Sequence, residues 1–346
     1  MSVAPEVTPS TTNVPLHGVN PGAAIAAIKE RSARWRKGDR EPDGRKIGLV
    51  IEGGAMRAVC SAGGAMALAH LGFTDLFDEV YATSAGAMNA SYFLSDQPEL
   101  GISVYFDNCT TRDFLSPLRV WKVIDIDYLF ERVVSKEKRL DVDKILASRT
   151  KLFVAVIDRR TGAGQVIEAK AASAPLLSVL KAATALPVLY NRAVDIDGRP
   201  FMDGGLAIPF PIEEALANGC TDVLNLLTRP ANFIFEAPGW ASRRMFDLIC
   251  ARGNAGFNQT YSLCHERSGA ARDLAFGRAP TPPGVNIATI CTDEPETIQR
   301  TTSDRALLRS AAVSYGRKTL RVFGADADSW DIKDGGTNCP PDGSLS

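Results

Sequence analysis

Short apolar runs along this chain alternate with segments of helical periodicity. The first run, Ile47–Ile51, ends at Gly53 and Gly54 and is followed by CSAGGAMALAHLG, which predicts a helix closed by a glycine. A second predicted strand at 79–82 leads into a predicted helix at 86–94. Two strand–loop–helix units in succession favour a parallel sheet with helices packed on its faces.

The same alternation continues to residue 227. The segment KLFVAVIDRRTGAGQVIEA predicts two strands joined by a turn, and the helical pattern of APLLSVLKAATALPVLY stops before Pro187. Asp197 and Gly198 are typical of a hairpin turn, and PIEEALANGCTDVLNLL predicts a helix and then a buried strand at 223–227. We therefore predict an α/β fold, with a mostly parallel central sheet in a three-layer α/β/α arrangement.

The remainder of the chain is predicted to be largely helical. Residues 240–276 favour helix, VNIATI predicts one more strand, and TSDRALLRSAAVSYGRKTLRVF combines a capping signal with helical periodicity. We expect five regions, namely a flexible tail at 1–21, a helix at 22–44, the α/β domain at 45–228, a helical extension packed on it at 229–325, and a flexible tail at 326–346.

Composition and charge narrow the class of protein. The chain has 346 residues, of which 45% are hydrophobic and 23% charged, as in soluble enzymes. Lysine and arginine (39) nearly balance aspartate and glutamate (40), so we expect no nucleic-acid partner. The basic helix at 22–44 fits a solvated surface helix better than a membrane-surface anchor. The oligomeric state is left open.

Cysteines and apolar segments bear on location and cofactors. Seven scattered cysteines without metal-ligand spacing predict reduced thiols, no metal and no cofactor. The sequence has no signal-peptide pattern at its start and no apolar run of about 18 residues that would span a membrane. We expect a cytoplasmic protein, with any membrane contact peripheral and at the inner face.

Ser84 lies where VYATSAGAMNASYFLS changes from strand to helix. A tight strand-to-helix turn with small neighbours exposes a serine Oγ for attack on an ester, and the next helix directs its positive end toward the developing charge. An ordinary helix N-cap is the competing interpretation, and the motif alone favours it.

The loop GGAMRA occupies the equivalent place after the first strand. Its small residues let backbone N–H groups converge on an oxyanion. A phosphate loop is the alternative, but the segment has neither the Gly-Lys-Ser/Thr of a P-loop nor G-x-G-x-x-G. Arg57 is a candidate for binding a substrate carboxylate or phosphate, with a surface salt bridge as the equal alternative.

Asp203 is the candidate general base. It follows a predicted short strand in PFMDGGLAIPFP, and burial beside apolar neighbours would raise its pKa toward the range a base needs. A turn-forming Asp-Gly is the alternative. None of the histidines His17, His70 and His265 follows a core strand, so we expect surface or packing roles for them.

Together these motifs resemble the patatin-like phospholipases, lipid acyl hydrolases with a Ser-Asp dyad. The resemblance covers roughly residues 47–227 and implies glycerophospholipids or other acyl lipids as substrates. By GGAMRA, ATSAG and DGG it implies Ser84 as the nucleophile and Asp203 as the base. It implies that the oxyanion and substrate-binding loop consists of Gly53, Gly54, Ala55, Met56 and Arg57.

Three alanines stand where the family has glycine, and they leave other functions open. Ala55, Ala58 and Ala82 could distort the loop or the turn, which would favour a catalytically weak lipid-binding module; acyl transfer is a further alternative. The apolar stretch 112–134 could line an acyl channel or contact lipid, but packing against the sheet is the simpler interpretation.

Overall fold

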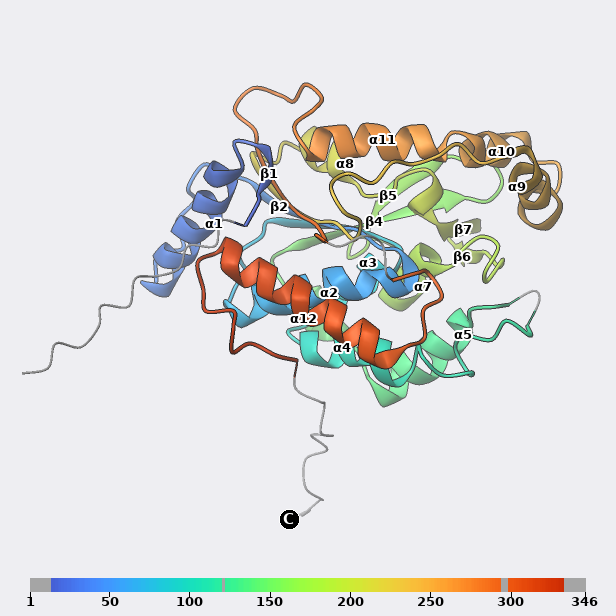
Figure 1. Cartoon of the computed structure of the whole chain (residues 1–346), viewed down its shortest axis with the longest axis horizontal. Helices are drawn as coiled ribbons and strands as arrows, with labels where there is room; N and C mark the ends of the chain where they lie inside the picture. The colour runs from blue at the N-terminus through green and yellow to red at the C-terminus, as the bar shows by residue number, and fades with distance from the viewer. Residues whose placement is uncertain (1–13, 120–121, 294–297, 333–346) are drawn as a thin grey trace, which may run out of the picture.

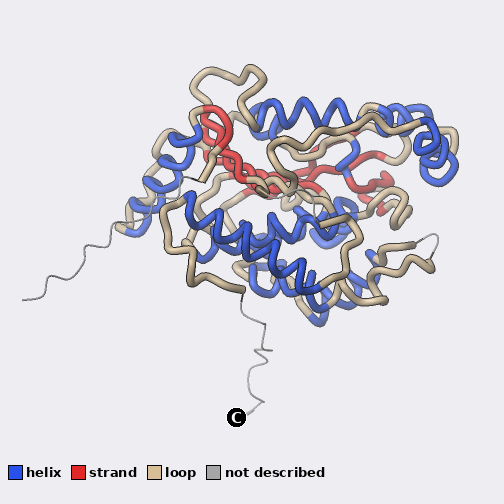
Figure 2. Tube along the Cα trace, in the orientation of Figure 1, coloured by secondary structure: helices blue, strands red, loops and turns tan. Residues whose placement is uncertain are grey.

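A mixed sheet runs through the molecule between two layers of helices (Figures 1 and 2). The computed structural model describes residues 14–119, 122–293 and 298–332. Within them the strand order is β1-β9-β8-β2-β3-β4-β7-β6, with β5 also paired to β4. The strands are β1 (His17–Val19), β2 (Ile47–Ile51), β3 (Glu79–Thr83), β4 (Lys151–Asp158), β5 (Gly164–Glu168), β6 (Val194–Ile196), β7 (Arg199–Asp203), β8 (Asp222–Leu226) and β9 (Asn286–Ile290).

The five strands β9, β8, β2, β3 and β4 are parallel, as the repeated strand–loop–helix pattern predicts. Most of their residues are buried on both faces, because alternate side chains enter different cores. Leu49 of β2 joins the larger core and its neighbour Val50 joins a second one. The predicted α/β fold is confirmed.

The helices divide between these cores. The larger core is covered by α1 (Pro21–Arg36), α2 (Val59–His70), α3 (Ala85–Leu94), α4 (Pro98–Asp107), α5 (Ile126–Tyr128), the π-helix η2 (Leu129–Glu137), α6 (Val142–Ala147), α7 (Leu176–Thr184) and α12 (Arg305–Val322). The opposite layer holds α8 (Ile212–Ala217), α9 (Trp240–Phe246), the π-helix η4 (Asp247–Ala251), α10 (Ala255–Ser262) and α11 (Cys264–Ala275). Short 3₁₀ turns form η1 (Ala55–Ala58) and η3 (Gly204–Leu206).

The carboxy-terminal third is not an extension added to a finished domain, which corrects the predicted boundary at 228. β9 pairs in parallel with β8, and α12 packs along α2 on the far side of the sheet from α11. Without these partners an edge of β8 and a face of α2 would lie open, so this segment completes the sheet and the larger core.

Parts of both predicted tails are also ordered, which is a second correction. β1 pairs antiparallel with β9, so the predicted tail at 1–21 includes a strand and the first residue of α1. At the other end Trp330 and Ile332 are buried in the larger core. Residues 1–13 and 333–346 of the predicted tails lie outside the described residues.

Candidate active site

Ser84 stands on a strained turn between β3 and α3. Its φ of 57° and ψ of −136° are unusual for a non-glycine residue, and its hydroxyl makes no capping hydrogen bond to α3. The N-cap alternative is therefore wrong for its side chain. The turn presents Ser84 at the end of the sheet beside the positive end of α3.

The glycine loop after β2 packs backbone to backbone against this turn. A Cβ on Gly53 would lie 2.3 Å from the Thr83 carbonyl oxygen, and a Cβ on Gly86 would lie 2.5 Å from the Ile51 carbonyl oxygen. Only glycine fits at either position. Because β2 and β3 are adjacent parallel strands, their two loops emerge at the same edge and reach this contact.

Backbone N–H groups of the loop are available at that edge. No hydrogen bond among the described residues uses the N–H of Gly53, Gly54 or Ala55 as a donor. The N–H of Met56, in contrast, donates to the carbonyl oxygen of Arg300 at 3.4 Å. Of the predicted loop, then, the first three residues have N–H groups free to meet an oxyanion, and Met56 does not.

Arg57 lies inside the molecule and not at its surface. Its side chain is only 5% exposed and is folded back against Gly54, where a Cβ would lie 3.1 Å from an Arg57 guanidinium nitrogen. This arrangement supports the φ of 133° at Gly54, a conformation that only glycine adopts readily.

The antiparallel strand β7 brings Asp203 to the end of the sheet where Ser84 lies. β3 pairs with β4 only as far as Ala155, opposite Thr83, and β7 pairs with β4 from Val156 onward, opposite Asp203. β5 pairs with the other edge of β4 over residues 153–157. β7 therefore pairs with the same edge of β4 as β3 does, beyond the point where β3 ends. The carboxyl ends of β3 and β7 therefore meet head to head.

The Asp203 carboxyl is held with its two oxygens in different roles. Oδ1 accepts a hydrogen bond from the Gly205 N–H at 2.8 Å, as the turn-forming interpretation predicts. Oδ2 is buried and makes no regular hydrogen bond to a described residue, although Ser84 is near enough to act on the pKa of the carboxyl. Such contacts are often long before substrate binds.

Burial raises the pKa of Asp203 to about 6. The side chain is 2% exposed, and loss of hydration disfavours the carboxylate. The nearby Ser84 hydroxyl, the hydrogen bond from the Gly205 N–H and the positive charge of Arg300 lower the pKa but do not offset burial. The group is thus poised to exchange a proton near neutral pH.

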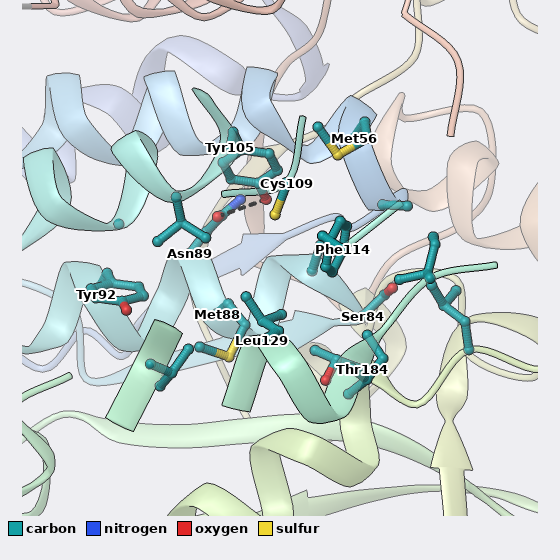
Figure 3. A pocket seen from close by; sticks show the side chains of 18 residues that line it. Met56, Ser84, Met88, Asn89, Tyr92, Tyr105, Cys109, Phe114, Leu129 and Thr184 are labelled. Atoms are coloured by element: carbon teal, nitrogen blue, oxygen red, sulfur yellow. Dashed lines mark hydrogen bonds between the residues drawn. The ribbon is translucent and has the colours of Figure 1, made fainter. Parts of the chain in front are cut away.

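Two hollows meet at Ser84. An outer pocket of about 390 Å³ is lined by the glycine loop, Asp203 and three arginines, Arg57, Arg229 and Arg300. An inner cavity of about 50 Å³ extends beneath the serine between apolar side chains (Figure 3). Ala55, Ser84 and Leu186 line both.

The apolar stretch 112–134 forms much of the inner cavity. It contributes Phe114, Ile124, Ile126, Leu129 and Val134. These side chains are also buried in the larger core, so the stretch packs against the sheet as the simpler interpretation predicts. That the cavity holds an acyl chain stays a prediction. Residues 120–121 lie outside the described residues.

Other residues that line the two hollows belong to no motif by which the sequence would identify them. The hydroxyl of Tyr105 donates to Asn89 Oδ1 at 3.0 Å in the wall of the inner cavity. Arg300 and Tyr261 come from the carboxy-terminal third, and only the fold brings them to the outer pocket. The three histidines lie in β1, α2 and α11, and none lines either hollow.

Comparisons with known proteins relate a large part of this chain to one family. A sequence model described as "Patatin-like phospholipase" matches residues 49–216, which include Ser84 and Asp203. The uncharacterized protein YjjU of Escherichia coli K12 is 30% identical over 204 residues, covering 57% of this chain and 56% of YjjU, so the chain spans about half the length of that curated relative.

Among solved structures, VipD from Legionella pneumophila matches 82% of this chain and 67% of its own, with 13% identity and a TM-score of 0.39. The family model covers the glycine loop after β2, the serine turn after β3 and the aspartate that ends β7. Residues 49–216, just under half of the chain, thus match the patatin-like phospholipase family.

Proposed function

We propose that this protein hydrolyses carboxylic esters of acyl lipids, with Ser84 as the nucleophile and Asp203 as the general base. The observation that carries the proposal is the place of Ser84. It stands between a narrow apolar cavity that suits an acyl chain and a wider pocket lined by arginines that suits a polar or anionic headgroup. An ester bond lying across this junction has its carbonyl carbon beside the serine.

In the first step Asp203 Oδ2 accepts the proton of Ser84 Oγ as that oxygen attacks the ester carbonyl carbon. The carbonyl oxygen becomes an oxyanion, which the N–H groups of Gly53, Gly54 and Ala55 stabilise. When the intermediate collapses, the C–O bond to the alcohol breaks and the alcohol leaves with the proton from Asp203. The acyl group remains on Ser84.

In the second step water replaces the alcohol. Asp203 accepts a proton from the water as its oxygen attacks the acyl-serine, and the same loop holds the second oxyanion. Collapse releases the fatty acid and returns the proton to Ser84. An alcohol in place of water would give acyl transfer, and product analysis with an added acceptor alcohol distinguishes the two.

The substrate lies in a lipid phase, so we also propose a peripheral membrane contact. No helix among the described residues is long and apolar enough to cross a membrane. We propose that the contact lies at the surface beside the outer pocket, because that pocket opens toward Ser84.

A fluorophosphonate probe tests the proposal. We expect the probe to label the wild-type protein at Ser84, and Ser84→Ala to abolish both labelling and ester hydrolysis. Asp203→Asn should slow labelling strongly, because the hydroxyl loses its base while the pocket keeps its shape. Hydrolysis that persists unchanged in Ser84→Ala would overturn the proposal.

A further inference from the structure

Large apolar side chains are exposed together on one segment near the outer pocket. Seven large hydrophobic residues of the described chain are exposed, and four of them lie between 234 and 248. They are Ile234 (80% exposed), Trp240 (84%), Met245 (53%) and Leu248 (65%). Single exposed hydrophobics are ordinary, but a group on one short segment indicates an interaction surface.

One side of this segment is packed into the interior of the molecule. Phe246 and Cys250, one helical turn apart, are buried in a small core against β4 and β7, and the Phe246 ring stacks on Tyr261 with centroids 4.1 Å apart. Because one side of α9 and η4 is fixed, Arg244 and Leu248 lie on the opposite side, away from the core. The exposed side chains are therefore presented at a fixed orientation, at the end of the molecule where α9 lies (Figure 1).

The same segment forms a wall of the site. Met245, Phe246 and Tyr261 line the outer pocket together with Ser84 and Asp203. Any membrane that α9 contacts would therefore lie beside the entrance of the outer pocket, through which a headgroup and its acyl chains must pass. Docking there places the ester near Ser84 without a long path through water.

The charge around the exposed apolar residues is locally positive. Arg243, Arg244 and Arg252 are exposed on this segment, against the acidic residues Glu236 and Asp247. Asp247 is engaged within the segment, accepting hydrogen bonds from the Asn258 amide at 2.7 Å and the Gly253 N–H at 2.8 Å. The chain as a whole carries a net charge of −1, so this excess is a local feature.

We propose that this surface, hereafter the α9 face (Ile234, Trp240, Arg244, Met245 and Leu248), docks on the surface of an anionic phospholipid bilayer. Tryptophan and aliphatic side chains enter the interface between headgroups and acyl chains, and arginines contact anionic headgroups. The proposal rests on the proposed lipid hydrolysis for its purpose, but binding can be measured without turnover.

The test uses the full-length protein and two kinds of vesicle, phosphatidylcholine alone and an equimolar mixture with phosphatidylglycerol. Sedimentation measures binding, and turnover is followed separately with a water-soluble short-chain ester. The variants are Trp240→Ala combined with Leu248→Ser, and Arg243→Gln combined with Arg244→Gln. Leu146→Ser, an exposed leucine on α6, is the matched control.

We expect the wild-type protein to prefer the mixed vesicles. The apolar pair of substitutions should weaken that binding by about tenfold or more, and the arginine pair should remove the preference for phosphatidylglycerol. Leu146→Ser should bind as the wild type does. All variants should hydrolyse the soluble ester at the wild-type rate, which also shows that they fold.

Tryptophan emission gives a second reading, because a shift to shorter wavelength on adding mixed vesicles should disappear in Trp240→Ala. The proposal that the α9 face docks on a bilayer is overturned if the wild-type protein binds neither kind of vesicle. It is also overturned if the apolar double variant binds the mixed vesicles as tightly as the wild type does. If the α9 face proves necessary for binding while no ester is hydrolysed, docking stands and the proposed hydrolysis fails. Ser84→Ala should bind vesicles normally.

Discussion

The alanines that replace glycines of the family differ in backbone conformation. Ala55 has a φ of 52°, in the left-handed region, which costs a non-glycine residue about 1 kcal/mol or more. Ala58 has a φ of −65°, and Ala82 is not among the residues with positive φ. Of these three alanines only Ala55 is strained, and the turn of Ser84 needs no glycine at position 82.

This difference predicts opposite effects of two glycine substitutions. Ala55→Gly should raise the free energy of unfolding by up to about 1 kcal/mol, because the left-handed strain is relieved. Ala82→Gly should lower it by about 0.5–1 kcal/mol, because a glycine within a strand has more freedom to lose. Urea unfolding of both variants measures the two changes, and the reverse order would contradict the account.

The raised pKa of Asp203 predicts how activity depends on pH. Only the carboxylate can accept the Ser84 proton, so kcat/KM for a soluble ester should rise as pH passes through about 6 and then level off. Arg300 lowers that pKa by its charge, so Arg300→Gln should move the midpoint to higher pH. A midpoint near the ordinary aspartate pKa of 3.8 would exclude Asp203 as the titrating base.

At the scale of the elements, the sequence predicts that the glycine loop packs against the turn of Ser84. It predicts less well that Asp203 lies beside the same serine. The first follows from two consecutive parallel strands, β2 and β3, which the local pattern predicts. The second depends on β7 continuing along β4 beyond the end of β3, and no short-range pattern shows which edge of β4 it takes.

The lining of the inner cavity depends on elements that contact each other only in the fold. Met88 of α3 lies one helical turn beyond Ser84 and projects into the cavity with Leu129 of η2 (Figure 3). The helical period of α3 predicts that Met88 shares a face with Ser84. It does not predict that 112–134 closes the other side.

Cavity size predicts a preference for short acyl chains, which Met88→Ala should relax. A volume of about 50 Å³ has room for roughly four water-sized groups, so we expect butyrate esters to react faster than octanoate esters. The variant should raise the octanoate-to-butyrate ratio of kcat/KM, at a loss of about 2–5 kcal/mol in unfolding free energy. Met66→Ala, equally buried on α2 but outside the cavity, is the control and should leave the ratio unchanged.

At the scale of the whole molecule, the site depends on segments from most of the chain. The carboxy-terminal third supplies Arg300 and Tyr261 to the outer pocket and β9 to the sheet. The sequence predicts helices there, but it contains no signal that they close a pocket around Ser84, because that requires knowing how α10 and α11 lie across the sheet.

The whole molecule should also be less stable when Asp203 is ionised. A carboxyl whose pKa is higher in the folded state than in the unfolded state binds more protons when folded, so stability falls as pH rises from 3.8 through about 6. Asp203→Asn removes this cost and keeps the side-chain size. We expect the variant to be more stable than the wild type at about pH 8, by up to about 3 kcal/mol, and to show little difference at about pH 4. Urea unfolding at both pH values measures this, with Asp197→Asn, on an exposed turn, as the control. If the variant differed from the wild type by the same amount at both pH values, ionisation of Asp203 would not lower the stability of the folded protein. Any stability lost by placing a base beside Ser84 would then have another source.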